Sequence, residues 1–145
     1  YWNDTSPTST VWTMGTQNAV NNSGEETIAY CFHSVEGYSK IGSYTGNGNA
    51  DGPFVYTGFR PSFVLSKETS DTSGWVIRDN KRNTFNPAED VLFANLSNVE
   101  EGSYDSDFLS NGFKLRNSGG DTNSSGNTYI YMAFAEQPFK YANAR

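Results

Sequence analysis

The residues able to do chemistry are few in this 145-residue chain. His33 is the single histidine and Cys31 the single cysteine. A Ser-His-Asp triad would need His33 as its base, but His33 lies in a strand-like run and no Gly-x-Ser-x-Gly nucleophile motif occurs. The 16 acidic residues supply carboxylate pairs by chance, so they do not indicate a glycosidase. We therefore predict that the protein is not an enzyme. We also predict no cofactor, with calcium as the one candidate.

One polar stretch has the pattern of a calcium loop. Asn47, Asn49 and Asp51 alternate, and Gly52 takes the sixth place. Gly58 stands where an EF-hand needs its bidentate carboxylate, which excludes an EF-hand. The alternative is a turn whose Asn and Asp side chains bond their own backbone, and we expect that alternative to hold. Asp105 and Asp107 form a weaker candidate.

Several aromatic side chains could bind a ligand or a partner. Tyr44, Tyr56 and Tyr104 lie near expected loops, where their rings could stack on sugars. Two aromatic clusters could form interfaces, since alternation sends half of a strand to each face. The first cluster comprises Phe54, Tyr56, Phe59 and Phe63, and the second Tyr129, Tyr131, Phe139 and Tyr141. From these we select Phe54, Phe59, Tyr131 and Phe139 as interface candidates.

The elements that must position these residues are short strands. Hydrophobic residues make up 35% of the chain and aromatics 15%, which suits a thin core between two sheets. Short β-branched and aromatic runs recur about every ten residues, separated by Gly, Asn and Pro clusters. The pattern predicts one all-β domain over residues 1–145, an antiparallel β-sandwich of jelly-roll or concanavalin-like type with about ten strands. The expected strands are Thr10–Thr16, Thr27–His33, Tyr38–Tyr44, Pro53–Thr57, Ser62–Lys67, Trp75–Asp79, Val91–Ala94, Phe108–Ser110, Gly112–Arg116 and Thr128–Ala135.

Turns and core follow from the same pattern. Asn111-Gly112 predicts a hairpin, and a short turn after Asn86-Pro87 is the one expected helix. Cys31 is expected to be buried as a small apolar residue. The expected core comprises Ile28, Tyr30 or Phe32, Val64, Trp75, Ile77, Phe108, Phe113, Leu115, Ile130 and Phe134.

Two segments of the chain resemble each other. Asn21-Asn22-Ser23-Gly24, followed by Ile28 and Phe32, matches Asn123-Ser124-Ser125-Gly126, followed by Ile130 and Phe134. Trp12-Thr13-Met14 and Phe113-Lys114-Leu115 precede the two copies. Biased composition could produce this match by chance. The alternatives are equivalent hairpins of one sandwich, or edges of tandem modules.

Charge and hydropathy exclude two kinds of partner. The net charge is −6, and only Arg78, Lys81 and Arg82 approach a basic cluster, so nucleic acid is not expected. No apolar stretch reaches the roughly 18 residues that a membrane span needs. Because the chain opens on Tyr1-Trp2 rather than Met, we expect a fragment of a longer protein.

Longer motifs carry a resemblance to a known family. They include residues 28–40, Gly42–Gly48, Ala50–Val55, Gly58–Pro61, Trp75–Ile77, Asp79–Arg82, Asp107–Arg116 and Tyr129–Phe139. The chain resembles an uncharacterised domain of tail-fibre and related structural proteins of marine and other bacterial viruses, a domain that often follows laminin-G-like (concanavalin-type) modules. The resemblance covers residues 28–139. It implies an extracellular virion-surface module, with no known reaction and no functional residues to carry over.

Two functions remain open from the sequence. In the first, a structural module joins copies of itself or neighbouring virion modules, in a tail fibre or as a capsid decoration protein. In the second, a carbohydrate-binding domain recognises a host surface glycan. A large exposed apolar patch would favour the first function. A concave site with exposed Tyr or Trp beside Asn and Asp would favour the second.

Overall fold

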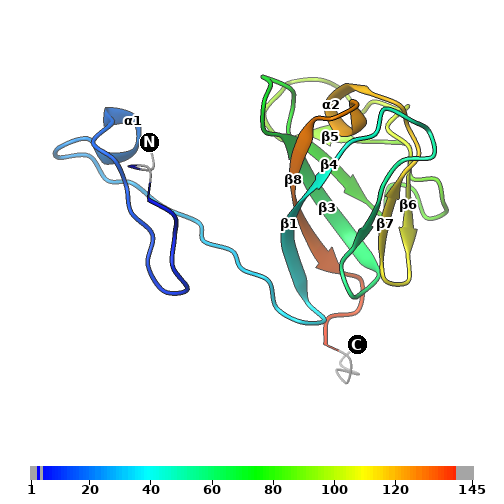
Figure 1. The fold of residues 1–145 in the computed structure, drawn as a ribbon, viewed down its shortest axis with the longest axis horizontal. Helices are drawn as coiled ribbons and strands as arrows, with labels where there is room; N and C mark the ends of the chain where they lie inside the picture. The colour runs from blue at the N-terminus through cyan, green and yellow to red at the C-terminus, as the bar shows by residue number, and fades with distance from the viewer. Residues whose placement is uncertain (1–2, 4, 140–145) are drawn as a thin grey trace. The chain divides into compact units, whose positions relative to one another are not determined.

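The computed structural model describes residue 3 and residues 5–139, and it divides the chain into two compact units. Unit 1 comprises Tyr1–Cys31 and unit 2 Phe32–Arg145. Among the described residues of unit 1, the one regular element is the helical turn α1 (Asn18–Asn21). All the described strands belong to unit 2, so the sandwich occupies this unit rather than the whole chain (Figure 1).

Unit 2 is an antiparallel β-sandwich, which confirms the expected fold class (Figure 1). The larger sheet has five strands in the order β1-β8-β3-β4-β5, and the smaller has three in the order β2-β7-β6. The strand bounds are β1 Ser39–Thr45, β2 Phe54–Tyr56, β3 Pro61–Glu68, β4 Val76–Asp79, β5 Leu92–Phe93, β6 Ser106–Leu109, β7 Gly112–Leu115 and β8 Thr128–Ala135. Each of these eight strands lies at or within two residues of an expected one.

The predicted hairpin joins β6 to β7. Leu109 pairs with Gly112, which leaves Ser110-Asn111 as a two-residue loop. Gly112 is required for steric reasons, since a Cβ there would lie 2.2 Å from the carbonyl oxygen of Val55. The hairpin prediction is therefore confirmed, with its turn one residue earlier than the Asn-Gly pair.

The first two expected strands were wrong. Residues 10–16 and 27–33 form no strand, although both have the right residue types. Ile28, Tyr30 and Phe32 are 77%, 81% and 55% exposed, and Cys31 is also exposed, so none is the core residue that the sequence indicated. The reason is that a strand needs neighbours to pair with, and none of the described strands flanks these segments.

The expected helix is also absent. Residues after Asn86-Pro87 are irregular, and Ala88 instead forms an isolated bridge with Ser106. The described helical turns are α1 and α2 (Gly120–Asn123), which lie in polar loops that propensity alone does not mark. No described helix is long and apolar enough to cross a membrane.

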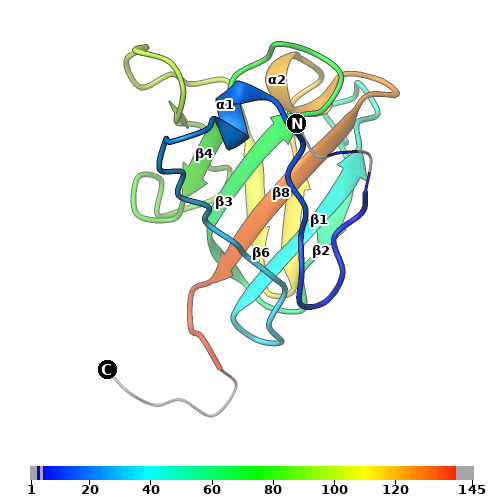
Figure 2. The same cartoon turned by 90° about the vertical axis from the view of Figure 1, so that its left-hand side faces the viewer.

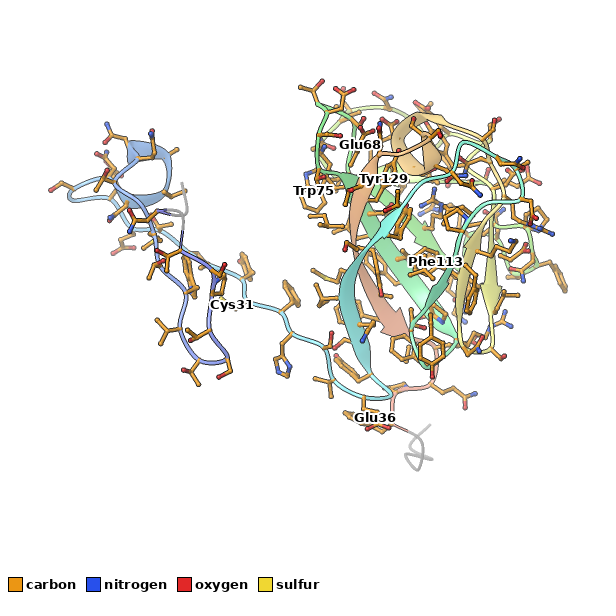
Figure 3. The ribbon with its side chains drawn as sticks, viewed as in Figure 1. Cys31, Glu36, Glu68, Trp75, Phe113 and Tyr129 are labelled. Atoms are coloured by element: carbon orange, nitrogen blue, oxygen red, sulfur yellow. The ribbon has the colours of Figure 1, made fainter. Side chains whose placement is uncertain are left out.

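The core lies between the two sheets (Figure 3). Val64, Phe108, Phe113 and Leu115 are buried, as predicted. A smaller cluster of Val76, Val91 and Phe93 packs with Tyr104. The inner face of the central strand β8 carries Tyr129, Tyr131 and Ala133.

On β4 and β8 the sequence prediction chose the wrong face. Trp75 and Ile77 are half-buried, Ile130 is 41% exposed, and Phe134 is half-buried, because all four lie on the outer face of the five-stranded sheet. In their place Val76, Arg78, Tyr129 and Tyr131 face the core. Both faces of these strands are rich in large side chains, so alternation alone could not select the inner one.

Candidate functional site

The outer face of the five-stranded sheet is apolar across its whole width. Ile41 pairs with Met132, Met132 with Leu65, Leu65 with Ile77, and Ile77 with Leu92. Because paired residues share a face, these five side chains form one continuous row over β1, β8, β3, β4 and β5. We call this row, together with Phe63, Trp75, Ile130 and Phe134, the outer apolar face. Figure 2 shows β1, β8, β3 and β4 side by side, and Figure 3 shows Trp75 on the side away from the core.

The face is partly hollowed. A shallow hollow of about 400 Å³ is lined by apolar residues of β1, β3 and β8 and by Trp75. Ile41, Leu65 and Met132 of the apolar row line it together with Ile130, and Ser43 is also part of the lining. A hollow of this kind can accept an apolar side chain from a partner surface.

An aromatic cluster closes one end of the face. The ring of Phe134 lies 6.3 Å from that of Phe32 and 5.9 Å from that of Tyr38, both edge-to-face. Phe63 approaches Phe134 at 6.1 Å, and Phe139 stacks on Tyr38 at 5.4 Å. Phe139, an interface candidate from the sequence, is 52% exposed and extends this apolar end.

Two charged residues lie on this face, and both bind backbone groups at strand ends. Asp79, which pairs with Phe63, accepts from Lys81 N (2.9 Å) and from Arg82 N (2.8 Å). Lys67 pairs with Ile130, but its Nζ donates to the carbonyl oxygens of Glu68 (2.5 Å) and Asp71 (2.7 Å) at the end of β3. The amine is thereby held at the margin of the face. The arrangement suits binding of an apolar surface rather than acid–base chemistry.

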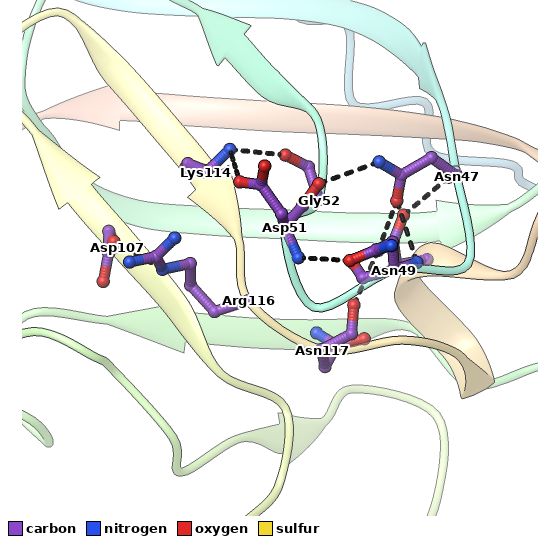
Figure 4. A network of polar contacts seen from close by, with 9 residues as sticks. Asn47, Asn49, Asp51, Gly52, Asp107, Lys114, Arg116 and Asn117 are labelled. Carbon is purple, nitrogen blue, oxygen red and sulfur yellow. Dashed lines mark hydrogen bonds and ion pairs between the residues drawn. The ribbon is translucent and has the colours of Figure 1, made fainter.

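The Asn side chains of the predicted calcium loop form hydrogen bonds with the backbone of the same loop (Figure 4). The Asn47 side chain accepts from Asn49 N (3.0 Å) and donates to the Asp51 carbonyl (2.9 Å). The Asn49 side chain accepts from Asp51 N (2.8 Å). Among the described residues no group of three or more His, Cys, Asp or Glu side chains could hold a metal ion. These contacts are those of the self-bonded turn, and calcium binding stays a prediction, testable as a rise in melting temperature at millimolar calcium.

Lys114 (Figure 4) and Asn123 fix this loop to the sandwich. Lys114 Nζ lies 2.8 Å from the Asp51 carboxylate, and this hydrogen bond, followed by the lysine charge, lowers the pKa of Asp51 below its ordinary value. Buried Asn123 accepts from Asn47 N (2.9 Å) and donates to Asn49 O (2.9 Å). The loop therefore serves to hold the end of the sandwich together.

The three tyrosines predicted to contact a ligand differ in how far they are buried. Tyr44 is buried, stacks on Tyr129 at 5.0 Å and donates to Thr122 O at 2.8 Å, so its ring faces the core and not a ligand. Tyr104 is half-buried and donates to Asp121 at 3.2 Å. Tyr56 is 63% exposed on β2, as the sequence indicated.

Among the other predicted interface residues, Phe59 and Tyr131 are core residues, 8% and 5% exposed. The even positions of β8 face outward, which turns Tyr131 inward. Phe54 remains exposed on β2. The structure thus divides the predicted set between the core, the outer apolar face and the smaller sheet.

The sequence prediction missed the five-residue apolar row from Ile41 to Leu92. Its signal was present in Thr128–Ala135, where both alternating sets contain large apolar or aromatic side chains. A strand with one face in water normally alternates apolar and polar residues, so this pattern indicates two covered faces.

Comparison with known proteins places the chain in a family. No curated protein and no solved structure matches the chain. Residues 1–138 match the family described as a domain of unknown function (DUF7483). Because the match covers nearly all of the 145 residues, the chain belongs to this DUF7483 family.

Proposed function

We propose that this protein is a non-enzymatic structural module that associates with copies of itself through the outer apolar face. The observation that carries the proposal is the five-residue apolar row from Ile41 to Leu92 across every strand of the larger sheet. Contiguous apolar surface on a soluble domain marks an interaction site. The resemblance to phage fibre domains supports a place in a tail fibre or related virion appendage, where modules repeat side by side.

The shape and chemistry of the face support this function. The core of a protein interface is apolar, aromatic and poor in charge, and the outer apolar face has these properties. Trp75 and Phe134 supply large rings, and Met132 supplies an adaptable side chain at the centre.

Sedimentation velocity of the full chain tests the proposal. The wild type is expected to associate as its concentration rises, and Met132→Glu to remain monomeric because it places a carboxylate at the centre of the row. Tyr56→Glu, an equal charge change on the smaller sheet, is the matched control and should associate like the wild type. Circular dichroism checks that both variants keep the β-sandwich. A wild type that stays monomeric at millimolar concentration would contradict the proposal.

A second candidate function rests on the smaller sheet. Phe54 and Tyr56 are exposed on β2, and Phe54 pairs with Lys114 of β7, whose amine binds Asp51. Exposed aromatic rings beside polar groups suit stacking on sugar rings, as in recognition of a host glycan. Binding of soluble glycans that Tyr56→Ala abolishes, and Met132→Glu does not, would support this function.

A further inference from the structure

Residues 15–25 repeat the local structure of residues 117–127, which join β7 to β8 and contain α2. α1 spans Asn18–Asn21 and α2 spans Gly120–Asn123, four residues each and 102 positions apart. At the same spacing, Gly24 and Gly126 have φ values of 82° and 80°, in the region that favours glycine. The similarity seen in the sequence is therefore also a similarity of backbone.

Two hydrogen bonds recur at the same spacing. The side chain of Asn21 donates to Gly15 O at 3.2 Å, and that of Asn123 donates to Asn117 O at 2.6 Å. Glu25 N donates to Asn22 O at 3.3 Å, and Asn127 N to Ser124 O at 3.2 Å. Biased composition explains matching residue types but not matching bonds between matching positions.

The two copies differ in their surroundings. β8 pairs with β1 on one side and with β3 on the other, whereas residues 27–33 pair with no described strand. Buried Asn123 also binds the backbone of Asn47 and Asn49, whereas Asn21 is exposed. The first copy thus shares the turn that joins β7 to β8 in unit 2. Its flanking residues, however, do not pair with any described strand as β8 does.

The side chains of the first copy match those of β8 at two outward positions and are smaller at two inward ones. Ile28 and Phe32 correspond to Ile130 and Phe134 on the outer side of β8, and Tyr30 lies between them. Thr27, Ala29 and Cys31 correspond to the inward Tyr129, Tyr131 and Ala133. No hydrophobic side chain is buried among the described residues of unit 1, and Ile28 and Tyr30 are 77% and 81% exposed.

The residues before the repeat do not supply a partner strand. The described residues 5–10 form no strand. To form strands, residues 11–14 and 27–33 would therefore need partners from another domain. Four neighbours would be needed, equivalent to β2 and β6 for the first strand and to β1 and β3 for the second.

We infer that residues 11–33 form the closing strand–turn–strand segment of a second sandwich of the same family. That sandwich has counterparts of β1, β2, β3 and β6 and receives from this segment the strands equivalent to β7 and β8. The asparagine at position 21 binds the loop equivalent to Asn47–Asn49. Because Thr27 and Ala29 are small, the core of the receiving sandwich is larger opposite these positions than that of unit 2. Successive modules are thereby joined by a segment that belongs to the fold of both.

An in-register duplication within the full chain tests the inference. Residues 1–112 are followed directly by residues 12–145, so that an inner copy of the segment continues from Gly112 in a sandwich that lacks the rest of its own β7 and all of β8, with Trp12 and Met14 at the positions of Phe113 and Leu115. The inner copy carries Thr27→Tyr and Ala29→Tyr, because this receiving core is the one that Tyr129 and Tyr131 normally fill. Hydrogen exchange is then measured for residues 27–33 in the inner and outer copies of the same molecule.

The expected result is that the inner amides exchange at least about 100-fold more slowly than the outer ones, since only the inner strand has neighbours. A matched control with inner Tyr30→Pro should lose this difference. The intact C-terminal sandwich reports whether the molecule is folded. Equal exchange of the two copies, with that sandwich still protected, would overturn the inference.

A second variant, in which one loop replaces the other, tests the inference even if the duplicated chain does not fold. In the natural chain, residues 117–126 are replaced by the sequence of residues 15–24, which keeps the asparagine at 123 and the glycine at 126. We expect a cooperative melt, and a marked drop in melting temperature when that asparagine is changed to alanine. A replaced loop that abolishes folding would overturn the equivalence of the two segments.

Discussion

Tyr44 shows how burial couples a single hydroxyl to the stability of the sandwich. Desolvation raises the pKa of Tyr44 to about 12, from an ordinary value of 10.0, against a smaller opposing effect of the Arg78 charge. The folded state therefore holds this proton in a range of pH where the unfolded chain has lost it. Stability from this group is complete below pH 10 and is lost as the pH rises through about 12.

We expect the free energy of unfolding to fall by roughly 2–3 kcal/mol between pH 10 and 12 through Tyr44 alone. Tyr44→Phe should be less stable at pH 8, because it loses the hydrogen bond to Thr122 O, but should show a shallower decline at high pH. Urea unfolding at a series of pH values measures both slopes. Parallel curves for the two proteins would contradict the assignment.

Arg78 is the second residue whose burial has a measurable consequence. It is 1% exposed between the sheets, and desolvation lowers the pKa of its guanidinium below the ordinary value. Its Nε donates to Tyr104 O (3.1 Å) and its Nη1 to Ser66 Oγ (3.3 Å), which links β3 and β4 to the segment before β6. The structure shows no ion pair of Arg78 with a described residue.

Arg78→Ala is expected to cost about 3 kcal/mol, since it leaves a cavity and an unpaired buried carbonyl. Arg78→Met should cost clearly less, because it fills the volume and removes a desolvated charge. Chemical denaturation of both variants measures the difference. Equal losses would show that the hydrogen bonds, rather than the packing, dominate at this position.

At the scale of elements, the sequence predicted where β8 begins and ends but not which of its faces is buried. The bounds Thr128–Ala135 were predicted correctly, because a run of β-branched and aromatic residues between polar turns indicates a strand. The inward face was not predicted, because both alternating sets are large and apolar. Selecting Tyr129 and Tyr131 over Ile130 and Phe134 requires knowing which neighbours lie on each side.

Truncations on the two faces should differ accordingly. Phe113→Ala, at a 2% exposed core position, is expected to cost about 3–5 kcal/mol. Phe134→Ala on the outer face should cost about 1–2 kcal/mol, through lost contacts with Tyr38 and Phe63. Thermal melts measure the two losses. A larger loss for Phe134→Ala would mean that Phe134, rather than Tyr129 and Tyr131, is on the side of β8 that faces the core.

The candidate site was predictable only in part for the same reason. Phe139 and the exposed pair Phe54 and Tyr56 could be selected from their residue types, whereas the row from Ile41 to Leu92 depends on the pairing of five strands. Ile41 and Leu92 are 51 positions apart in the chain, and no local pattern relates them. The self-bonded turn at Asn47–Asp51 was foreseeable because its hydrogen bonds are local.

At the scale of the whole molecule, we predict that the sandwich folds independently of residues 1–31. Every residue of its main core comes from Tyr44 to Ala135. We expect a chain of residues 32–145 to melt within about 3 °C of the full chain, because deletion of residues 1–31 removes no core side chain. Differential scanning calorimetry measures this, with deletion of residues 128–145 as the unfolded control. A drop of more than about 10 °C would show that residues 1–31 contribute to the stability of the sandwich.

The chain enters and leaves the sandwich at one end, and this has a mechanical consequence. Phe139 N donates to Gly37 O at 2.9 Å, and Ala135 N to Tyr38 O at 2.9 Å, so the start of β1 and the end of β8 are adjacent (Figure 1). A force that pulls residues 35 and 139 apart loads the antiparallel β1–β8 ladder from that end, where Ser39 pairs with Phe134. The ladder then opens one rung at a time, up to Thr45 and Thr128, instead of resisting in shear. A filament of such domains would yield to axial tension by peeling, unless lateral contacts between neighbouring copies carried the load.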